Sequence, residues 1–321
     1  MKHRILVTGA SGFVGGAVLE RLQADPEKSV TAVVRGDGKL SAPVDIVRIE
    51  AFSPQTQWQS HLLGVHTIIH CAARVHVMND TEADPLAAFR RVNVEGTINF
   101  ARQAASAGVR RFVFISSIKV NGESTLPGKP YTAADIPAPA DPYGISKNEA
   151  EQGLKQVAQM TGMELVIIRP VLVYGPGVKA NFLSMMRWLD KGIPLPFGAI
   201  NNRRSLVYID NLVDLIVICI DHASAANQTF LVSDGEDLST TMLLGRMARS
   251  LGKPARLIPV PGWILEYGAR ALGKATLSQR LCGSLQVDIE KNRALLSWSP
   301  PVNVNSGLEK TARYFKMNQA K

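Results

Sequence analysis

A glycine-rich turn near the N-terminus constrains this chain more than any other feature. The apolar run Ile5–Thr8 leads directly into Gly9, Gly12 and Gly15, and a helical pattern follows. In a strand–turn–helix unit the first glycine permits a tight turn. The second lets a phosphate approach the backbone, and the third lets helix and strand pack closely. The N–H groups at the helix start then face the phosphates, so the turn predicts a dinucleotide-binding fold.

Short apolar runs alternate with helical patterns through the first half of the chain. This alternation predicts βαβ units and a doubly wound parallel sheet with helices on both faces, an α/β fold. The expected strands are Ile5–Thr8, Val30–Val34, Val44–Ile49, Thr67–His70, Arg111–Ser116 and Leu165–Arg169. The expected helices are Phe13–Ala24, a stretch around Thr56–Leu63, Pro85–Ala107 and Pro142–Thr161.

The pattern loosens after Arg169-Pro170, where prolines and glycines cluster. A strand–helix unit at Leu206–Cys219, a strand at Thr229–Val232 and a C-terminal helical region follow. We predict a dinucleotide-binding domain over residues 1–170 and, mainly over 171–321, a smaller α/β substrate lobe. Part of 206–232 is expected to return to the main sheet.

Composition sets the cellular context that we expect. The three cysteines, Cys71, Cys219 and Cys282, are widely spaced in apolar surroundings, which is typical of buried thiols in a reducing compartment. The most apolar later window, Leu212–Ile220, is too short to span a membrane, and no signal peptide is evident. We expect a cytoplasmic protein without an integral membrane span.

The charge pattern and the histidines exclude two further classes of site. The formal net charge is +9, but Lys and Arg are scattered along the chain, so no nucleic-acid-binding track is expected. The six histidines lack metal-ligand spacing, so no metal site is expected either.

A tyrosine and a lysine stand four residues apart near the start of a predicted helix. At this spacing Tyr143 and Lys147 share one helix face. A cation beside a phenol should lower its pKa from about 10 and make it a general acid and base. Ser117 follows a buried strand, where its hydroxyl could hydrogen-bond the reacting oxygen.

The end of the second predicted strand bears on the choice of cofactor. An acid there would bind the ribose hydroxyls of NAD(H), but this chain has Val33-Val34-Arg35, with Asp37 two residues farther on. Arg35 suits a 2′-phosphate, so NADP(H) is favoured over NAD(H).

Together these motifs resemble the extended short-chain dehydrogenase/reductase family, in its nucleotide-sugar epimerase, dehydratase and reductase group. The resemblance spans essentially the whole chain and implies a Rossmann-type sheet. It rests on Thr8–Gly15, His70-Cys71-Ala72-Ala73, Val92–Thr97, Phe114–Ser117, Tyr143–Lys147, Arg169-Pro170 and Val173–Gly177. It implies that Tyr143 moves the proton, that Ser117 holds the sugar oxygen, and that Lys147 tunes the tyrosine and binds the nicotinamide ribose.

The family serine stands three residues before a V-Y-G-like element, so Val120-Asn121-Gly122 selects Ser117 over Ser116. The cofactor contacts that the resemblance implies are Gly9, Ser11, Gly12, Phe13, Val14, Gly15, Arg35, Ala72, Ala73, Asn93, Tyr143, Lys147 and Pro170. The implied UDP-binding residues are Asn181, Leu195, Phe197, Arg204 and Arg280. A homodimer is compatible with the family.

The neighbours of Ser117 narrow the chemistry within this group. Family 4,6-dehydratases carry an Asp-Glu pair directly after the hydroxyl, where this chain has Ile118-Lys119. A dehydratase is therefore not expected. Lys119 and Asn121 depart from the small or hydroxylic residue and the tyrosine usual in the family, and Ala51-Phe52 replaces an Asp-Leu pair that normally holds adenine.

Two oxidoreductases then remain. The favoured one is an NADPH-dependent 4-reductase of a UDP-4-keto-6-deoxy-N-acetylhexosamine, in bacterial surface-polysaccharide (O-antigen) precursor synthesis. The alternative is a UDP-glucose or UDP-N-acetylglucosamine 4-epimerase with tightly bound NAD. A polyprenyl-diphosphate-linked sugar at the membrane face is a less favoured substrate, suggested by the apolar segment Pro261–Lys274.

Overall fold

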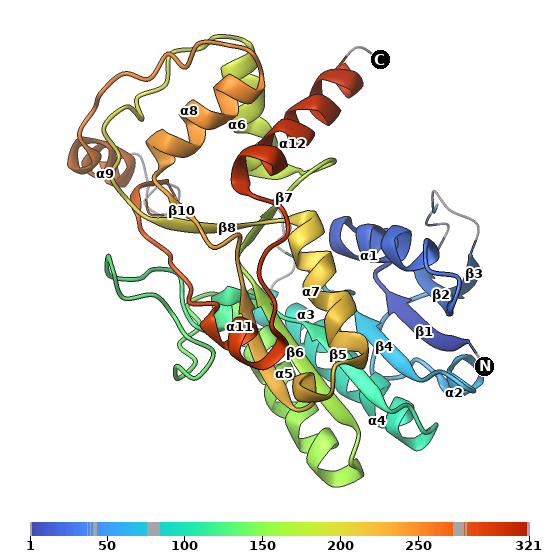
Figure 1. Cartoon of the computed structure of the whole chain (residues 1–321). Helices are drawn as coiled ribbons and strands as arrows, with labels where there is room; N and C mark the ends of the chain where they lie inside the picture. The colour runs from blue at the N-terminus through green and yellow to red at the C-terminus, as the bar shows by residue number, and fades with distance from the viewer. Residues whose placement is uncertain are drawn as a thin grey trace.

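A seven-stranded sheet forms the centre of the molecule (Figure 1). The computed structural model describes residues 2–36, 38, 40, 44–75, 84–271, 279 and 281–319. The strand order is β3-β2-β1-β4-β5-β6-β9, and every neighbouring pair is parallel. The strands are β1 His3–Thr8, β2 Lys28–Arg35, β3 Asp45–Ile49, β4 Thr67–His70, β5 Arg111–Ile115, β6 Glu164–Pro170 and β9 Gln228–Val232. The predicted doubly wound α/β fold is confirmed.

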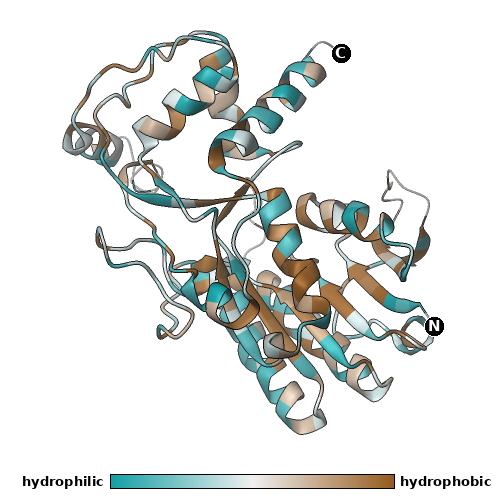
Figure 2. Cartoon of the chain, in the orientation of Figure 1, coloured by the Kyte–Doolittle hydropathy of each residue, from teal (hydrophilic) through white to brown (hydrophobic). Residues whose placement is uncertain are grey.

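Alternating apolar side chains place a hydrophobic core on each face of the sheet. In β5, Val113 and Ile115 enter one core, whereas Phe112 and Phe114 enter the other. This is the period of two expected of a strand that is covered on both sides. Figure 2 shows the central strands coloured mostly hydrophobic.

Helices from distant parts of the chain cover the two faces. On one face α1 packs against α7, and on the other α4 packs against α5. Their bounds are α1 Phe13–Gln23, α7 Ile209–Asp221, α4 Thr97–Ser106 and α5 Pro142–Thr161. Helix α5 starts and stops as its sequence predicts, because Asp141 caps Gly144 N–H and Gly162 adopts a left-handed φ of 76°.

A smaller lobe lies beyond the carboxyl ends of the main strands (Figure 1). Its three-stranded sheet has the order β10-β8-β7, with β7 Leu172–Tyr174, β8 Arg204–Tyr208 and β10 Asp237–Leu238. Its helices include α6 Ala180–Asp190, α8 Thr240–Ser250, α9 Gly262–Ala271 and α12 Val304–Gln319. Helix α11, Glu290–Leu296, returns to the main sheet and contacts β9.

Two helix predictions were wrong in detail. Instead of one regular helix over Pro85–Ala107, the chain forms α3 (Pro85–Arg90), the π-helical segment η1 (Arg91–Gly96) and then α4. Around Thr56–Leu63 only α2, Gln59–Leu62, is helical. There the carbonyl of Thr56 accepts hydrogen bonds from the Asn99 and Gln103 amides at 2.9 and 3.0 Å, which fixes a turn before the helix begins.

Candidate active site

The glycine-rich turn lies between β1 and α1. Gly9 has a φ of 67°, which favours glycine, and Gly12 N–H donates to Gly9 O at 2.9 Å. A Cβ on Gly15 would stand 2.2 Å from Gly9 O, and one on Gly9 would stand 2.7 Å from Ala72 N. The fold therefore requires glycine at both positions, because the turn is pressed between the start of α1 and the loop after β4.

Gly12 is less constrained by the rest of the chain, because its Cβ would approach Gly9 O only to 3.1 Å. It is the N-cap of α1, whose start has no side-chain cap and whose first turn carries no acidic residue. Exposed N–H groups and the helix dipole therefore favour an anion here. Ser11, Phe13 and Val14 flank this helix start, so these residues fit the diphosphate of a dinucleotide.

The position of the turn within the sheet agrees with this fit. Strand β1 lies between β2 and β4. From β1 the strand order runs through β2 and β3 to one side of the sheet and through β4, β5 and β6 to the other, so the order reverses at β1. Ligands of open α/β sheets bind in the crevice at such a switch point, beyond the carboxyl ends of the strands. Arg35 is exposed at the carboxyl end of β2, the strand next to the turn.

The loop after β4 is fixed from two sides. On one side Ala72 N–H donates to Thr8 Oγ1 at 3.2 Å. On the other, the Asn93 amide accepts from Arg74 N–H at 2.8 Å and donates to Arg74 O and Ser146 Oγ, each at 3.0 Å. Ala72 and Ala73 are thereby held next to the glycine turn, and Asn93 ties this loop to α5.

Ser116 and Ser117 have different surroundings. Ser116 is buried, and its Oγ donates to Glu151 Oε1 at 2.5 Å. Ser117 lines a cavity, and its Oγ accepts from Lys119 N–H at 3.2 Å. Because Ser116 is turned into the interior, the hydroxyl that faces the cavity is that of Ser117.

Tyr143 lines the same cavity from the first turn of α5, and its ring packs edge-on against Phe89 at 6.0 Å. The prediction that Lys147 lowers the pKa of Tyr143 was wrong. Burial raises that pKa well above its usual value, and the nearby Asp141 carboxylate raises it further. The ionisation of Tyr143 is therefore governed by burial and by Asp141.

Lys147, one turn after Tyr143 on α5, is held at the end of β5. Its side chain is buried, its Nζ donates to Ile115 O at 2.8 Å, and it lies 4.3 Å from the ring centre of Phe114. Burial lowers the pKa of Lys147 to about 8. Its ammonium is thus fixed to the strand that leads to Ser117.

The cavity has a volume of about 430 Å³, within the range of small-molecule sites. Aliphatic side chains form much of its wall, including Val75, Ile118, Leu172, Val173, Met185, Leu206, Leu243, Leu281 and Leu285. Within the described part of the chain, its polar side chains are Ser117, Lys119, Glu123, Tyr143, Asn181, Arg204, Thr240 and Gln279. Pro170, at the end of β6, also lines it. Main sheet and smaller lobe thus both contribute to one site.

The predicted UDP-binding residues divide into three groups. Asn181 and Arg204 line the cavity, and Arg204 Nη1 also donates to Gly283 O at 2.9 Å. Leu195 and Phe197 are not among the described residues that line it. Leu195 is buried and pairs with Leu257, and Phe197 O accepts from Thr241 Oγ1 at 2.5 Å. Arg280 lies outside the described residues.

Sequence reasoning missed a charged cluster in this cavity. Lys119 Nζ contacts the carboxylates of Asp141 and Glu123, the latter at 3.1 Å. The spacing of Lys119 and Glu123 as i and i+4 was a local signal for one pair, but nothing in the pattern related Lys119 to Asp141.

A buried polar network below the cavity was also missed. Arg169 donates to both carboxylate oxygens of Glu151, at 2.9 and 2.5 Å, and to Asn121 Oδ1 at 2.9 Å. Asn121 Nδ2 in turn donates to Thr132 O at 3.0 Å. Asn121, which departs from the family tyrosine, is therefore the residue that completes the hydrogen bonding of Arg169.

Two further expectations concern metals and membranes. Within the described ranges, no group of three or more His, Cys, Asp or Glu side chains is placed to hold a metal ion. None of the helices formed by the described residues combines the length and the apolar character that crossing a bilayer requires. In the apolar segment 261–274, Trp263 and Tyr267 of α9 are 71% and 76% exposed, and residues 272–274 lie outside the described ranges.

The sequence pattern of the NAD dependent epimerase/dehydratase family matches residues 5–233 of this chain. A protein of Vibrio cholerae named UDP-glucose 4-epimerase is 49% identical, over 98% of this chain and 96% of that protein. A protein of Escherichia coli O157:H7, named N-acetyl-alpha-D-glucosaminyl-diphospho-ditrans,octacis-undecaprenol 4-epimerase, is 26% identical over 98% and 96% of the two chains.

Solved structures show the same fold. UDP-N-acetylglucosamine 4-epimerase from Bacillus cereus superposes with a TM-score of 0.80 at 19% identity, covering 98% of this chain and all of that chain. UDP-glucose 4-epimerase from Thermotoga maritima, solved with UDP-glucose, gives 0.77 at 22% identity, covering 98% and 99% of the two chains.

Proposed function

The chain belongs to the NAD dependent epimerase/dehydratase family and is an enzyme, and from this premise we propose that it acts on C4 of a UDP-linked hexose, as a 4-epimerase. The observation that carries the proposal is the 49% identity, over 98% of the chain, to a protein named UDP-glucose 4-epimerase. Ser117 and Tyr143 line the same cavity, and this supports the proposal, because two hydroxyls are then available to one bound sugar.

Each residue of the site would have a distinct role at C4 of the sugar. Tyr143 removes the proton of the C4 hydroxyl when that carbon is oxidised and returns a proton when it is reduced. Ser117 Oγ hydrogen-bonds the same oxygen. Lys147, one helical turn after Tyr143, holds its ammonium at the end of β5. A bound nicotinamide dinucleotide supplies the hydride acceptor and donor. The apolar walls exclude water around the reacting carbon.

The position of Lys147 also indicates where the ribose of the cofactor would bind. Its ammonium is fixed by Ile115 O at 2.8 Å, close to the carboxyl end of β5. The glycine turn and the loop at Ala72 end on the same edge of the sheet. We propose that a dinucleotide lies along this edge, with its diphosphate at Gly12 and its ribose at Lys147.

The reduction of a UDP-4-keto-6-deoxy-N-acetylhexosamine is a second candidate, and a specific observation favours it. The raised pKa of Tyr143 keeps the phenol protonated at neutral pH, so it is ready to donate to a ketone oxygen. The largely aliphatic cavity also suits a sugar that carries a methyl group in place of the C6 hydroxyl. For this activity we propose NADPH, because exposed Arg35 ends β2 where an acid would favour NADH.

Dehydration is not part of the proposal. Glu123 does bring a carboxylate to the cavity, but it is paired with the Lys119 ammonium at 3.1 Å. Asp141, the other carboxylate in contact with Lys119, caps α5. Neither carboxylate therefore follows the Asp-Glu arrangement that family dehydratases use.

One set of assays separates these functions. Purified protein is incubated with UDP-glucose and with UDP-N-acetylglucosamine, with and without added NAD, and the products are separated by chromatography. In parallel, UDP-4-keto-6-deoxy-N-acetylhexosamine is mixed with NADPH or NADH, and absorbance of the reduced nicotinamide is followed. Interconversion of C4 epimers without net cofactor consumption supports the epimerase. Consumption of reduced cofactor, with no epimerisation, supports the reductase. Turnover in neither assay contradicts both.

A further inference from the structure

Lys119 lies between the two catalytic elements proposed above. It belongs to the short 3-10 turn η2, Ile118–Val120, directly after Ser117. Its ammonium contacts Asp141, the residue that caps the first turn of α5, and Glu123 at 3.1 Å. Because Asp141 accepts Gly144 N–H at 2.7 Å, the Lys119 side chain holds the group that fixes the start of this helix. Tyr143 lies in that same turn.

The backbone of Lys119 contacts the same two elements. Its N–H donates to Ser117 Oγ at 3.2 Å. Its carbonyl oxygen faces Gly144 so closely that a Cβ there would stand 2.8 Å away. One residue therefore contacts the serine turn through its N–H and the tyrosine helix through its carbonyl and its ammonium. A family residue that is small or hydroxylic at this position could not supply the charged contact.

We propose that Lys119 is a positioning residue, which clamps the first turn of α5 onto the Ser117 turn and thereby sets Tyr143 against the substrate oxygen. This inference rests on the proposed function, in which Tyr143 transfers the proton. Lys119 is held by two carboxylates, and its side chain is 28% exposed, so it is partly shielded from solvent. A clamp of this kind acts on proton transfer more than on UDP binding.

The clamp also acts on charge. The Asp141 carboxylate contributes to the raised pKa of Tyr143, and the Lys119 ammonium beside it offsets that negative charge. Among the described residues, the other charged side chains that line the cavity are Glu123 after η2 and Arg204 on β8, and Lys147 follows Tyr143 by one turn on α5. Removing Lys119 leaves Asp141 and Glu123 without its ammonium, so the pKa of Tyr143 should rise further. Where Tyr143 acts as base, a smaller fraction of the phenol is then ionised at a given pH, so kcat should fall.

A set of variants tests both effects in the full-length, cofactor-loaded enzyme. Lys119→Met should lower kcat by about tenfold and change KM by less than about twofold. Lys119→Arg should restore most of kcat. Asp141→Asn keeps an N-cap, and in the Lys119→Met background it should restore part of kcat, because the carboxylate that raises the pKa of Tyr143 is gone. Lys155→Met, on the exposed face of α5, should change neither quantity. The proposal is overturned if Lys119→Met keeps wild-type kcat, or if kcat and KM change by the same factor.

A second measurement does not depend on the substrate. Amide hydrogen exchange at Gly144 and Ile145 should be faster in Lys119→Met than in the wild type, and wild-type-like in Lys119→Arg and Lys155→Met. If the wild type turns over no UDP-sugar, the proposed function fails, while exchange still decides the clamp. Unchanged exchange in Lys119→Met would overturn the clamp whichever substrate is used.

Discussion

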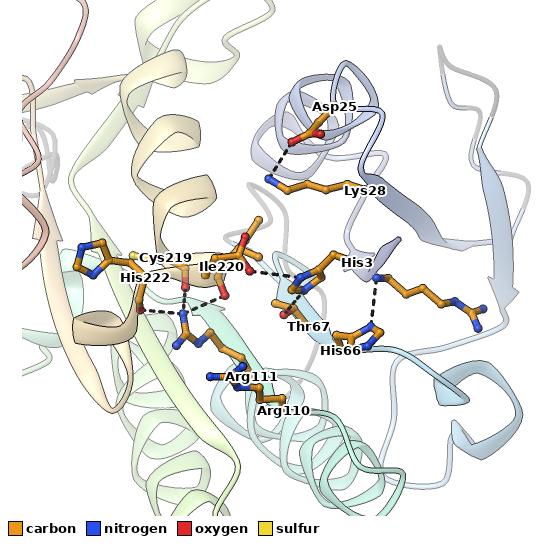
Figure 3. Close-up of polar contacts among 12 residues, drawn as sticks. His3, Asp25, Lys28, His66, Thr67, Arg110, Arg111, Cys219, Ile220 and His222 are labelled. Carbon is orange, nitrogen blue, oxygen red and sulfur yellow. Dashed lines mark hydrogen bonds and ion pairs between the residues drawn. The ribbon is translucent and has the colours of Figure 1, made fainter. Parts of the chain in front are cut away.

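The two ends of the strands in the seven-stranded sheet differ. Where the strands begin, here called the amino edge, charged side chains meet partners within the chain, whereas where the strands end, the carboxyl edge, Ser117 and Tyr143 are directed toward a cavity. Figure 3 shows the amino edge. There Arg111, the first residue of β5, donates to the carbonyls of Cys219, Ile220 and His222 at 2.8, 2.9 and 3.0 Å. It also pairs with Glu164 at 2.7 Å.

Nearby, the ring of His3 bridges two elements of the same edge. Its Nε2 lies 2.9 Å from Thr67 Oγ1 (Figure 3). Its Nδ1 lies 3.3 Å from Asp221 Oδ1. These contacts join β1, β4 and the end of α7.

The carboxyl edge is built differently. It presents the glycine turn at Gly12, the Ser117 hydroxyl and the Tyr143 phenol, and the last two face the cavity. The difference shows how one sheet can serve two purposes. Polar groups that meet partners inside the chain stabilise the fold, and those directed at a cavity serve a ligand. Substitutions at the two edges should therefore separate activity from stability.

Tyr143→Phe should have the largest effect on activity. Loss of the phenolic hydroxyl removes the proposed acid and base, so kcat should fall at least about a hundredfold, with little change in Tm. Turnover is measured on whichever UDP-sugar is active. Tyr314→Phe, on α12 and 45% exposed, is the matched control and should keep its activity. Near-normal turnover by Tyr143→Phe would contradict the mechanism.

Arg111→Met should show the opposite pattern. The side chain is 3% exposed, and its loss leaves three carbonyls and Glu164 without its hydrogen bonds. The free energy of unfolding should fall by about 3 kcal/mol, while kcat of the folded enzyme is unchanged. Chemical denaturation measures this. Arg110→Met, whose side chain is 75% exposed, should cost less than about 0.5 kcal/mol. Equal losses in the two variants would refute the contrast.

Substitutions of Gly12 and Gly15 should distinguish dinucleotide binding from stability within the same turn. Gly12→Ala should lower Tm slightly, because its Cβ would stand in a tight contact 3.1 Å from Gly9 O, and it should bind the dinucleotide at least about tenfold more weakly. Gly15→Ala should lower Tm much more, because its Cβ would stand 2.2 Å from Gly9 O. Calorimetric titration with NAD and NADP, together with thermal unfolding, measures both. Unaltered dinucleotide affinity in Gly12→Ala would exclude the diphosphate site.

His70 lies at the carboxyl end of β4, and its replacement should have the smallest effect, a change in how stability depends on pH. It is buried between Thr8 and Thr97, and burial lowers its pKa well below the usual 6.5. Below pH 6.5 the unfolded chain takes up a proton that the folded chain does not, so stability falls as pH falls. The slope should be up to about 1.4 kcal/mol per pH unit. His70→Gln should reduce the slope of the unfolding free energy against pH between pH 6.5 and 5.5, as measured by chemical denaturation. An identical slope in the variant would show that another group causes the dependence.

The sequence predicted the parts of the molecule that depend on local patterns. The glycine turn, the six strands and the Asp141 cap all follow from periodicity and spacing within a few residues. The choice of Ser117 over Ser116 agrees with the cavity that Ser117 lines, and the structure adds the reason that Ser116 is held by Glu151.

Features that depend on contacts between distant residues were not predictable. The pairing of Lys119 with Asp141 joins residues 22 apart, and it required knowing how η2 packs on α5. The expected effect of Lys147 on Tyr143 failed for a similar reason. Spacing placed both residues on one helix face, but the ammonium is held by Ile115 O, and Asp141 acts on the phenol instead.

The place of β9 in the sheet has a consequence for how the protein is made. Strand β9 pairs with β6, although 57 residues, 171–227, separate them in the sequence. Arg111 likewise finds its carbonyl acceptors only in residues 219–222, which are synthesised more than 100 residues later. As the chain leaves the ribosome, the open edge of β6 and the buried guanidinium thus stay without their partners until most of the chain has been synthesised. We expect the first half of the nascent protein to depend on chaperones during that interval, and to complete its fold only late in synthesis.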